Sequence, residues 1–221
     1  MPLFDTMEFL QDEEPHSAPV NMAMDEVLLK EISVPTLRAY CWLRPAVSFG
    51  YFEKYSAIEN LHPGLELVRR WTGGGVVFHS GDFTYSLIIP SDHTLVKMRP
   101  AESYLAIHES LTQAMLGAGM VASLTAGASP KISSACFENA VPHDVLEGGR
   151  KIAGAAQRRT RHGLLHQGSI QTAELPGNFG KQFAAKLAAG VIQRQVKQSE
   201  LSAAIELAGS KYATPQWLRK F

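Results

Sequence analysis

The sequence predicts a mixed α/β domain of the α+β kind, in which a mixed β-sheet is flanked by helices. Segments rich in β-branched and aromatic residues dominate the early and middle parts of the chain, and helical segments are interspersed without strict alternation. With 221 residues, 45% of them hydrophobic, the chain suits one large domain, or one domain with a small appendage. We find no internal repeat and no interdomain linker, so we expect residues 1–221 to form a single domain.

The first predicted elements are one helix and two strands. Residues 21–32 carry apolar side chains at helical spacing, and Asn21 can cap the start of this helix. Pro35 prevents the helix from continuing. Residues 36–42 and 47–51 are rich in β-formers, and we expect them to form two strands.

The chain is organised around Glu66–Pro90, which predicts a strand, a glycine turn, a strand, a tight turn and a strand. The glycines Gly73–Gly75 leave the backbone bare, so that it can adopt φ > 0 or lie against a ligand. A bulged hairpin corner explains the same glycines without a ligand. Arg70 before the turn and His79 after it favour a turn that faces a ligand. No Gly-Lys-Ser/Thr follows, so the turn is not a nucleotide-binding P-loop.

The second half of the chain predicts further helices and strands. In order, we expect a helix over 100–118, a hairpin with a Gly-Gly turn over 144–157, a strand over 164–170, and helices over 181–193 and 197–208.

Composition excludes several classes of protein. The formal net charge is +0, so nothing draws the whole chain to nucleic acid or to an anionic membrane. Cys41 and Cys136 are the only cysteines, too few for a disulfide framework in a chain of this length. There is no signal peptide pattern, no apolar stretch of about 18 residues, and no metal-ligand spacing. We therefore expect a soluble cytoplasmic protein without a metal.

Two residues are candidates for chemistry. Cys136 lies on a loop rich in small and polar residues, whereas Cys41 lies between two aromatic residues and fits a buried packing role. A nucleophilic thiol also needs a nearby cation or base. Lys151 follows the Gly-Gly turn, and it is either a solvated charge or a group that holds a carbonyl or phosphate oxygen. The cations within 150–161 form either a solvated edge or a docking face for an acidic partner.

Taken together, four segments resemble the biotin/lipoate protein ligase and octanoyltransferase superfamily. They are Asn21–Glu26, Arg69–His79, Gly149–Gln157 and His166–Ile170. The resemblance implies a biotinyl/lipoyl-ligase-like catalytic domain, with an acyl chain in a tunnel beside the glycine turn. The cysteine-dependent octanoyltransferases are the most similar branch, because Ser133–Phe137 and the later Gly-Arg-Lys are like their nucleophile and lysine pair.

The resemblance also implies roles for individual residues. Cys136 would carry the acyl group as a thioester, and Lys151 would bind the carbonyl oxygen as charge develops. The residues that would line the acyl site are Arg70, Gly73, Gly74, Gly75, His79, Gly154 and Ala155. No cofactor is implied. Octanoyl acyl carrier protein would be the donor, and a lysine on a lipoyl domain, such as the glycine-cleavage H protein, the acceptor.

Three alternatives stay open. An amidotransferase would move octanoyl between lipoyl domains, and its sequence would look nearly the same. An ATP-dependent lipoate ligase is less favoured, because Gly81-Asp82 stands where ligases typically have Gly-Asn. A non-catalytic binder of lipoyl domains is disfavoured by the intact Cys136, Lys151 and glycine triplet.

Overall fold

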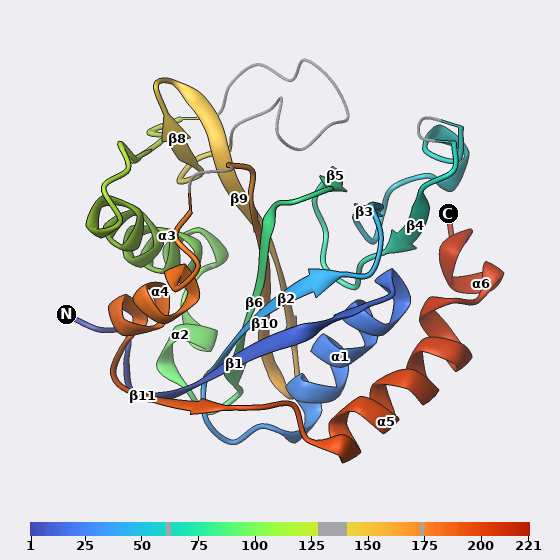
Figure 1. The fold of residues 1–221 in the computed structure, drawn as a ribbon, viewed down its shortest axis with the longest axis horizontal. Helices are drawn as coiled ribbons and strands as arrows, with labels where there is room; N and C mark the ends of the chain where they lie inside the picture. The colour runs from blue at the N-terminus through green and yellow to red at the C-terminus, as the bar shows by residue number, and fades with distance from the viewer. Residues whose placement is uncertain (61–62, 128–140, 173–174) are drawn as a thin grey trace.

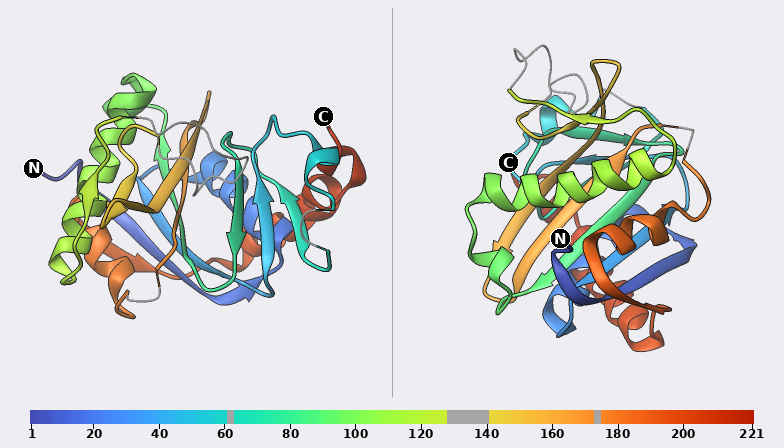
Figure 2. Two further views of the ribbon diagram at one scale, coloured as in Figure 1. Left: turned by 90° about the horizontal axis from the view of Figure 1, so that it is seen from above. Right: turned by 90° about the vertical axis from the view of Figure 1, so that its left-hand side faces the viewer.

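The computed structural model describes residues 1–60, 63–127, 141–172 and 175–221. Within these residues, eight strands form one large mixed sheet, and three strands form a smaller sheet to one side of it (Figure 1). Helices cover both faces of the large sheet (Figure 2). The predicted class, a mixed sheet flanked by helices, is confirmed.

The elements have the following bounds. The strands are β1 (Phe4–His16), β2 (Thr36–Trp42), β3 (Ala46–Phe49), β4 (Glu66–Arg69), β5 (Val76–His79), β6 (Phe83–Pro90), β7 (Ser123–Leu124), β8 (Val145–Glu147), β9 (Arg150–Thr160), β10 (Gly163–Ile170) and β11 (Ala188–Arg194). The helices are α1 (Ala18–Glu31), α2 (Thr94–Lys97), α3 (Pro100–Gly117), α4 (Phe179–Leu187), α5 (Gln198–Leu207) and α6 (Pro215–Leu218), with a 3₁₀ turn η1 (Tyr55–Ala57) and a π-helical turn η3 (Ala208–Tyr212).

The large sheet has the strand order β11-β1-β2-β6-β10-β9-β8-β7, and it separates two cores. Successive residues of a strand point to opposite faces. On β6, Leu87 and Ile89 therefore join the core that contains α3 and α4, while Ile88 joins the core that contains α1 and α5. In the part of the chain that the structure describes, no helix is long and apolar enough to cross a membrane.

Several predicted elements are confirmed. Strand β2 has the predicted bounds, and α3 ends within one residue of the prediction. Strands β8 and β9 pair as the expected antiparallel hairpin. Gly148 and Gly149 both have positive φ in its turn, which explains why glycine is needed there.

Two predictions about helix bounds are wrong. Helix α1 begins at Ala18, so Asn21 is not a cap; its Nδ2 donates to the carbonyl of Cys41 at 3.0 Å instead. The predicted helix over 181–193 ends at Leu187, and the chain continues as β11, a parallel partner of β1. Strand β1 was not predicted, and pairing with it overrides the helical spacing after Leu187.

The central stretch around the glycine turn is not a hairpin. Strand β3 lies between β4 and β5, parallel to the first and antiparallel to the second. After β5 the chain leaves the small sheet, and β6 joins the large one between β2 and β10. The alternative of a bulged hairpin corner is therefore wrong, because β4 and β5 both pair with β3 and not with each other. The glycine turn links two strands of the small sheet.

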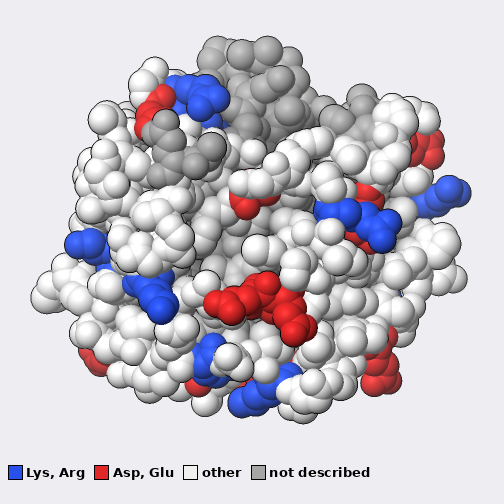
Figure 3. Space-filling view, viewed as in Figure 1, with Lys and Arg blue, Asp and Glu red and all other residues white. Residues whose placement is uncertain are grey.

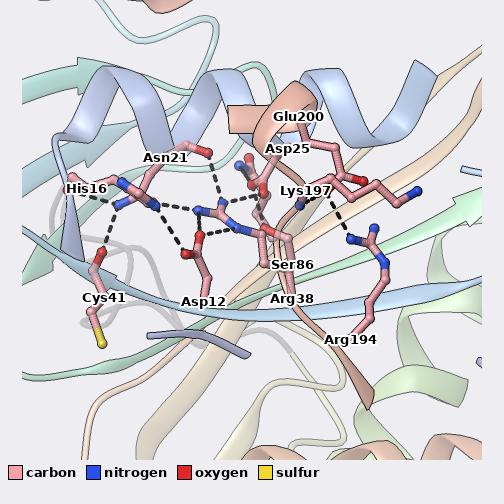
Figure 4. Close-up of polar contacts among 11 residues, drawn as sticks. Asp12, His16, Asn21, Asp25, Arg38, Cys41, Ser86, Arg194, Lys197 and Glu200 are labelled. Atoms are coloured by element: carbon pink, nitrogen blue, oxygen red, sulfur yellow. Dashed lines mark hydrogen bonds and ion pairs between the residues drawn. The ribbon is translucent and has the colours of Figure 1, made fainter. Parts of the chain in front are cut away.

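A buried ion-pair cluster joins α1 to the large sheet (Figure 4). The Arg38 side chain is fully buried and lies 2.7 Å from Asp12 Oδ2 and 2.9 Å from Asp25 Oδ1. It also donates to the side chain of Asn21 at 2.7 Å. Burial opposes the charge of Arg38, but the two carboxylates outweigh it and raise the pKa of the guanidinium. The guanidinium therefore keeps its charge inside the protein.

We predict that Arg38→Leu lowers the free energy of unfolding by about 3–5 kcal/mol, because it leaves the carboxylates of Asp12 and Asp25 buried without their cation. Urea unfolding at pH 7 measures the loss. Arg44→Leu, at an exposed position, is the control and should change stability by no more than about 0.5 kcal/mol. Equal effects of the two substitutions would contradict the prediction.

Candidate functional site

The candidate site is a pocket between the two sheets, beside the glycine turn. About 430 Å³ of empty space, part of it open to solvent, lies between β9 and β10 of the large sheet and β3 and β5 of the small one. The wall that faces this space is almost wholly apolar. An apolar wall with a few polar groups is typical of pockets that bind small ligands.

Five of the seven residues predicted to line an acyl site border this pocket. They are Arg70, Gly74, His79, Gly154 and Ala155. The glycine and alanine residues of β9 leave the space open because their side chains are at most a methyl group. The structure thus brings these five together, and their role toward a ligand stays a prediction.

The other two predicted residues, Gly73 and Gly75, accept hydrogen bonds at their carbonyl oxygens from Arg70 Nη2, at 3.0 and 2.8 Å. Between them, Gly74 has a φ of +85°, a conformation that suits glycine alone. We had not predicted Gly50 as a site residue, yet a Cβ there would lie 1.8 Å from the Gly74 carbonyl oxygen. Its place at the end of a predicted strand was a weak signal. The turn requires glycine at both positions.

A buried relay of hydrogen bonds supports one wall of the pocket. Arg70 Nη1 donates to Ser48 Oγ at 2.8 Å. Because the Asp82 carboxylate only accepts, His79 Nδ1 donates to its Oδ2 at 2.8 Å. Nε2 of the neutral ring then accepts from the Ser48 hydroxyl at 2.7 Å. Burial lowers the pKa of His79. Burial also works to raise the pKa of Asp82, but the hydrogen bond and charge of His79, together with hydrogen bonds from Ser169 and Thr84, outweigh it and lower that pKa. The pair is therefore a neutral imidazole beside a carboxylate.

The relay has the connectivity of a hydrolytic triad, but Ser48 is only 1% exposed and its oxygen already accepts from Arg70. Other polar groups in the lining are engaged in the same way. The Gln167 amide is bonded at both ends by buried neighbours, and Trp42 Nε1 donates to Thr84 Oγ1 at 2.8 Å. These polar groups satisfy one another, so the interior presents mainly carbon to a ligand.

Lys151 lies on β9 next to Gly154, one of the residues that line the pocket. In a regular strand Lys151 and Gly154 would face opposite sides, but a bulge in β9 brings them to one side. The Lys151 Nζ lies 2.7 Å from Asp144 Oδ2 and 2.8 Å from the place of a Cβ on Gly154. Asp144 Oδ1 accepts from the Tyr104 hydroxyl at 2.5 Å. Since Lys151 is 8% exposed, the alternative of a solvated charge is wrong.

The structure describes one of the two cysteines. Cys136, the predicted nucleophile, lies outside the described residues. Cys41, expected to be packed in the interior, is exposed at β2, which corrects that expectation. Its partial burial, with the nearby Asp12 and Asp82, raises the pKa of the thiol, the opposite of what a nucleophile needs. Among the described residues, no group of three His, Cys, Asp or Glu is placed to hold a metal ion.

The cations within 150–161 do not form one docking face. Arg158 donates to the carbonyl of Trp71 at 3.0 Å beside the small sheet, whereas Arg159 donates to Ser103 Oγ at 2.6 Å on α3. Successive residues of β9 thus send their charges to opposite faces of the sheet. On the face shown in Figure 3, Lys and Arg side chains are scattered over the surface.

A pair of buried histidines lies between the large sheet and α3. His108 Nδ1 donates to the carbonyl of His143 at 2.7 Å, and the ring of His108 meets that of His166 edge-on at 5.5 Å. Burial lowers the pKa of His108 to about 4, although the charge of Asp144 opposes the shift. Burial also lowers the pKa of His166. Both rings are therefore neutral near pH 7.

The fold is a mixed α/β domain with a largely apolar pocket between its two sheets. The chain belongs to the lipoyl protein ligase A/B catalytic domain family, which it matches over residues 17–198. Octanoyltransferase LipM of Carboxydothermus hydrogenoformans is 37% identical over 161 residues, which cover 68% of this chain and 59% of LipM. The chain thus spans about three fifths of the length of that relative.

Two solved structures share the fold at lower identity. Protein Ta0514 from T. acidophilum superposes with a TM-score of 0.78 and 21% identity, over 98% of this chain and all of that one. A bi-partite lipoate protein ligase from Thermoplasma acidophilum, described together with its E2 lipoyl domain, gives a TM-score of 0.67 at 21% identity, over 99% of this chain and 98% of that one. These likenesses support the fold alone.

We predict that His108 makes the protein less stable in mild acid. Because the folded pKa of about 4 lies below the ordinary 6.5, unfolding takes up a proton, and this part of the stability is lost as pH falls from 6.5 toward 4. Urea unfolding at pH 7 and pH 4.5 should show a drop about 2–3 kcal/mol larger for the wild type than for His108→Asn. His162→Asn, on a partly exposed turn, is the control. Equal drops for wild type and His108→Asn would contradict the prediction.

Proposed function

We propose that this chain acts as the catalytic part of an octanoyltransferase in protein lipoylation. The donor is octanoyl acyl carrier protein, and the acceptor is a lysine on a lipoyl domain, such as the glycine-cleavage H protein. The likeness to LipM of C. hydrogenoformans supports the octanoyl group and the transfer reaction. A solved structure of the same fold is described with its E2 lipoyl domain, and the proposed acceptor is of that kind.

The observation that carries the proposal is the way the pocket hides its polar groups. Ser48, His79 and Gln167 border the space, yet each has its hydrogen bonds met by buried neighbours. A polar ligand would lose its bonds to water there without gaining new ones. An unbranched apolar chain loses nothing of this kind and gains from the burial of its surface. The pocket therefore favours a fatty acyl group.

The proposed reaction has two steps. First, the thiolate of Cys136 attacks the carbonyl carbon of the octanoyl thioester, the carrier thiol leaves and takes up a proton, and octanoyl is held as an enzyme thioester. One thioester replaces another, so the step is nearly isoenergetic and needs no ATP. Second, the neutral amine of the acceptor lysine attacks that thioester, an amide forms, and the thiol of Cys136 is released. The second step runs downhill because an amide is more stable than a thioester.

Lys151 serves as the cation that stabilises the oxygen of the carbonyl as negative charge develops on it. Its amine is held near Gly154, at the edge of the pocket, by the 2.7 Å pair with Asp144. Tyr104 fixes that carboxylate in turn, and the Tyr104 oxygen accepts from the backbone N–H of Ala155 at 3.0 Å. The positive charge is thus oriented before substrate arrives.

We also propose that residues 1–221 work as one catalytic domain. Side chains of α5 and η3 share a buried core with α1 and with β6 and β10 of the large sheet. Tyr212 in η3 donates to the Glu26 carboxylate of α1 at 2.7 Å. The C-terminal helices therefore support the element that carries Asp25.

We predict that incubation with octanoyl acyl carrier protein adds one octanoyl group to Cys136, as read by mass spectrometry of the intact protein and its peptides. Cys136→Ser should carry no thioester and should not modify a lipoyl domain. Cys41→Ser is the matched control and should behave like the wild type, because its thiol pKa is raised. Transfer that survives in Cys136→Ser would defeat the proposal, and a strict need for ATP and Mg²⁺ would point to a ligase.

We predict that Gly154→Ala slows acylation of Cys136 by about tenfold or more, because the new methyl group would lie 2.6 Å from Lys151 Cε and push the amine aside. Gly177→Ala, where a Cβ meets nothing within 4 Å, is the control. Single-turnover rates measure the effect, and urea unfolding checks that both variants are folded. A normal rate in Gly154→Ala would count against a role for Lys151.

A further inference from the structure

A chain of buried hydrogen bonds joins the glycine turn to the ion-pair cluster of Arg38. Thr72, which immediately precedes the turn, donates from Oγ1 to Gln167 Oε1 at 2.7 Å. Gln167 Nε2 donates to Asp25 Oδ2, also at 2.7 Å. Asp25 is held in turn by Arg38 at 2.9 Å and by the hydroxyl of Ser86 at 2.5 Å. Each of these side chains belongs to a residue that is at most 7% exposed.

The direction of these bonds is fixed by chemistry. A carboxylate only accepts, so Gln167 must turn its NH₂ group toward Asp25. Its oxygen then faces Thr72, whose hydroxyl must donate. The amide cannot be flipped without opposing two acceptors on one side. The side-chain amide of Gln167 thus has one orientation, which is set by Asp25 on α1.

Gln167 also borders the pocket, so it both forms part of the wall and supports the residue before the glycine turn through a hydrogen bond. The turn needs support of this kind, because its three glycines have no side chains that could form anchoring contacts. Its other supports are the Arg70 contacts to Gly73 and Gly75, and the hydrogen bond from Tyr51 N–H to the Thr72 carbonyl at 2.8 Å. The Thr72 hydroxyl is the side-chain anchor nearest to the turn in sequence.

We propose that Gln167 is a positioning residue for the acyl site, which acts through Thr72 to hold the Gly73–Gly75 turn against the acyl chain. The inference rests on the proposed function, because it takes the turn as part of the acyl site. The bond acts on the wall of the pocket and not on the reacting thioester. Its loss therefore weakens binding of the octanoyl donor and leaves the chemical step intact.

The test is a double-mutant cycle on octanoyl transfer to a lipoyl domain. Thr72→Val and Gln167→Leu should each raise the KM for octanoyl acyl carrier protein by about tenfold, with kcat within about twofold of the wild type. The double variant should show about the same tenfold change and not about a hundredfold, because the two substitutions break the same bond between Thr72 and Gln167. Thr72→Ser keeps the hydroxyl and should restore the wild-type KM.

A second measurement does not depend on activity. Backbone hydrogen exchange at Tyr51, whose N–H donates to the Thr72 carbonyl, should be about tenfold faster in both single variants and normal in Thr72→Ser, with unchanged exchange in β6. Unchanged exchange at Tyr51, or effects on KM that multiply in the double variant, would overturn the role of Gln167. If the wild type transfers no octanoyl group, the proposed function fails, and hydrogen exchange alone decides whether Gln167 holds the turn.

Discussion

The buried guanidinium of Arg38 is the constraint on which the rest of the structure depends. A cation inside a protein must be paired, and Arg38 finds its partners on two other elements, Asp12 on β1 and Asp25 on α1. Because the second oxygen of Asp25 accepts from Ser86 on β6 and Gln167 on β10, one carboxylate ties the helix to the middle of the sheet. The same carboxylate is linked through Gln167 to Thr72, the residue before the glycine turn.

The pocket owes its character to polar residues as much as to apolar ones. Ser48, Arg70 and His79 would each make an open cavity hydrophilic. Here they form hydrogen bonds with one another and with the glycine turn. What they leave exposed is carbon, and glycine and alanine on β9 keep the space between the sheets open. The same groups that look like a ligand-binding set in the sequence therefore work as a scaffold. Beside Gly154 of the lining, Lys151 is paired with Asp144.

Prediction from sequence succeeded where the signal was local. The periodicity of α3 and the Gly148-Gly149 turn between β8 and β9 need no distant partner to be recognised. Prediction failed where the structure of a segment depends on pairing with a distant segment of the chain. The chain after Leu187 has helical spacing but forms a strand, because it pairs with β1 at the edge of the large sheet. Strands β4 and β5 do not form a hairpin, because β3 pairs with both. Cys41 was expected inside because its neighbours are aromatic, yet the strand turns it outward.

By itself, the sequence determined the mixed-sheet class, the family, and the set of residues around the glycine turn, because these depend on residue type and order. Only the tertiary structure decided how those residues are used. The bulge in β9 brings Lys151 to the same side as Gly154, and Gly50 meets the carbonyl of Gly74 from another strand. The link from Asp25 through Gln167 to Thr72 joins three separate segments of the chain. Such contacts join residues that are far apart in the sequence, so a local sequence pattern does not reveal them.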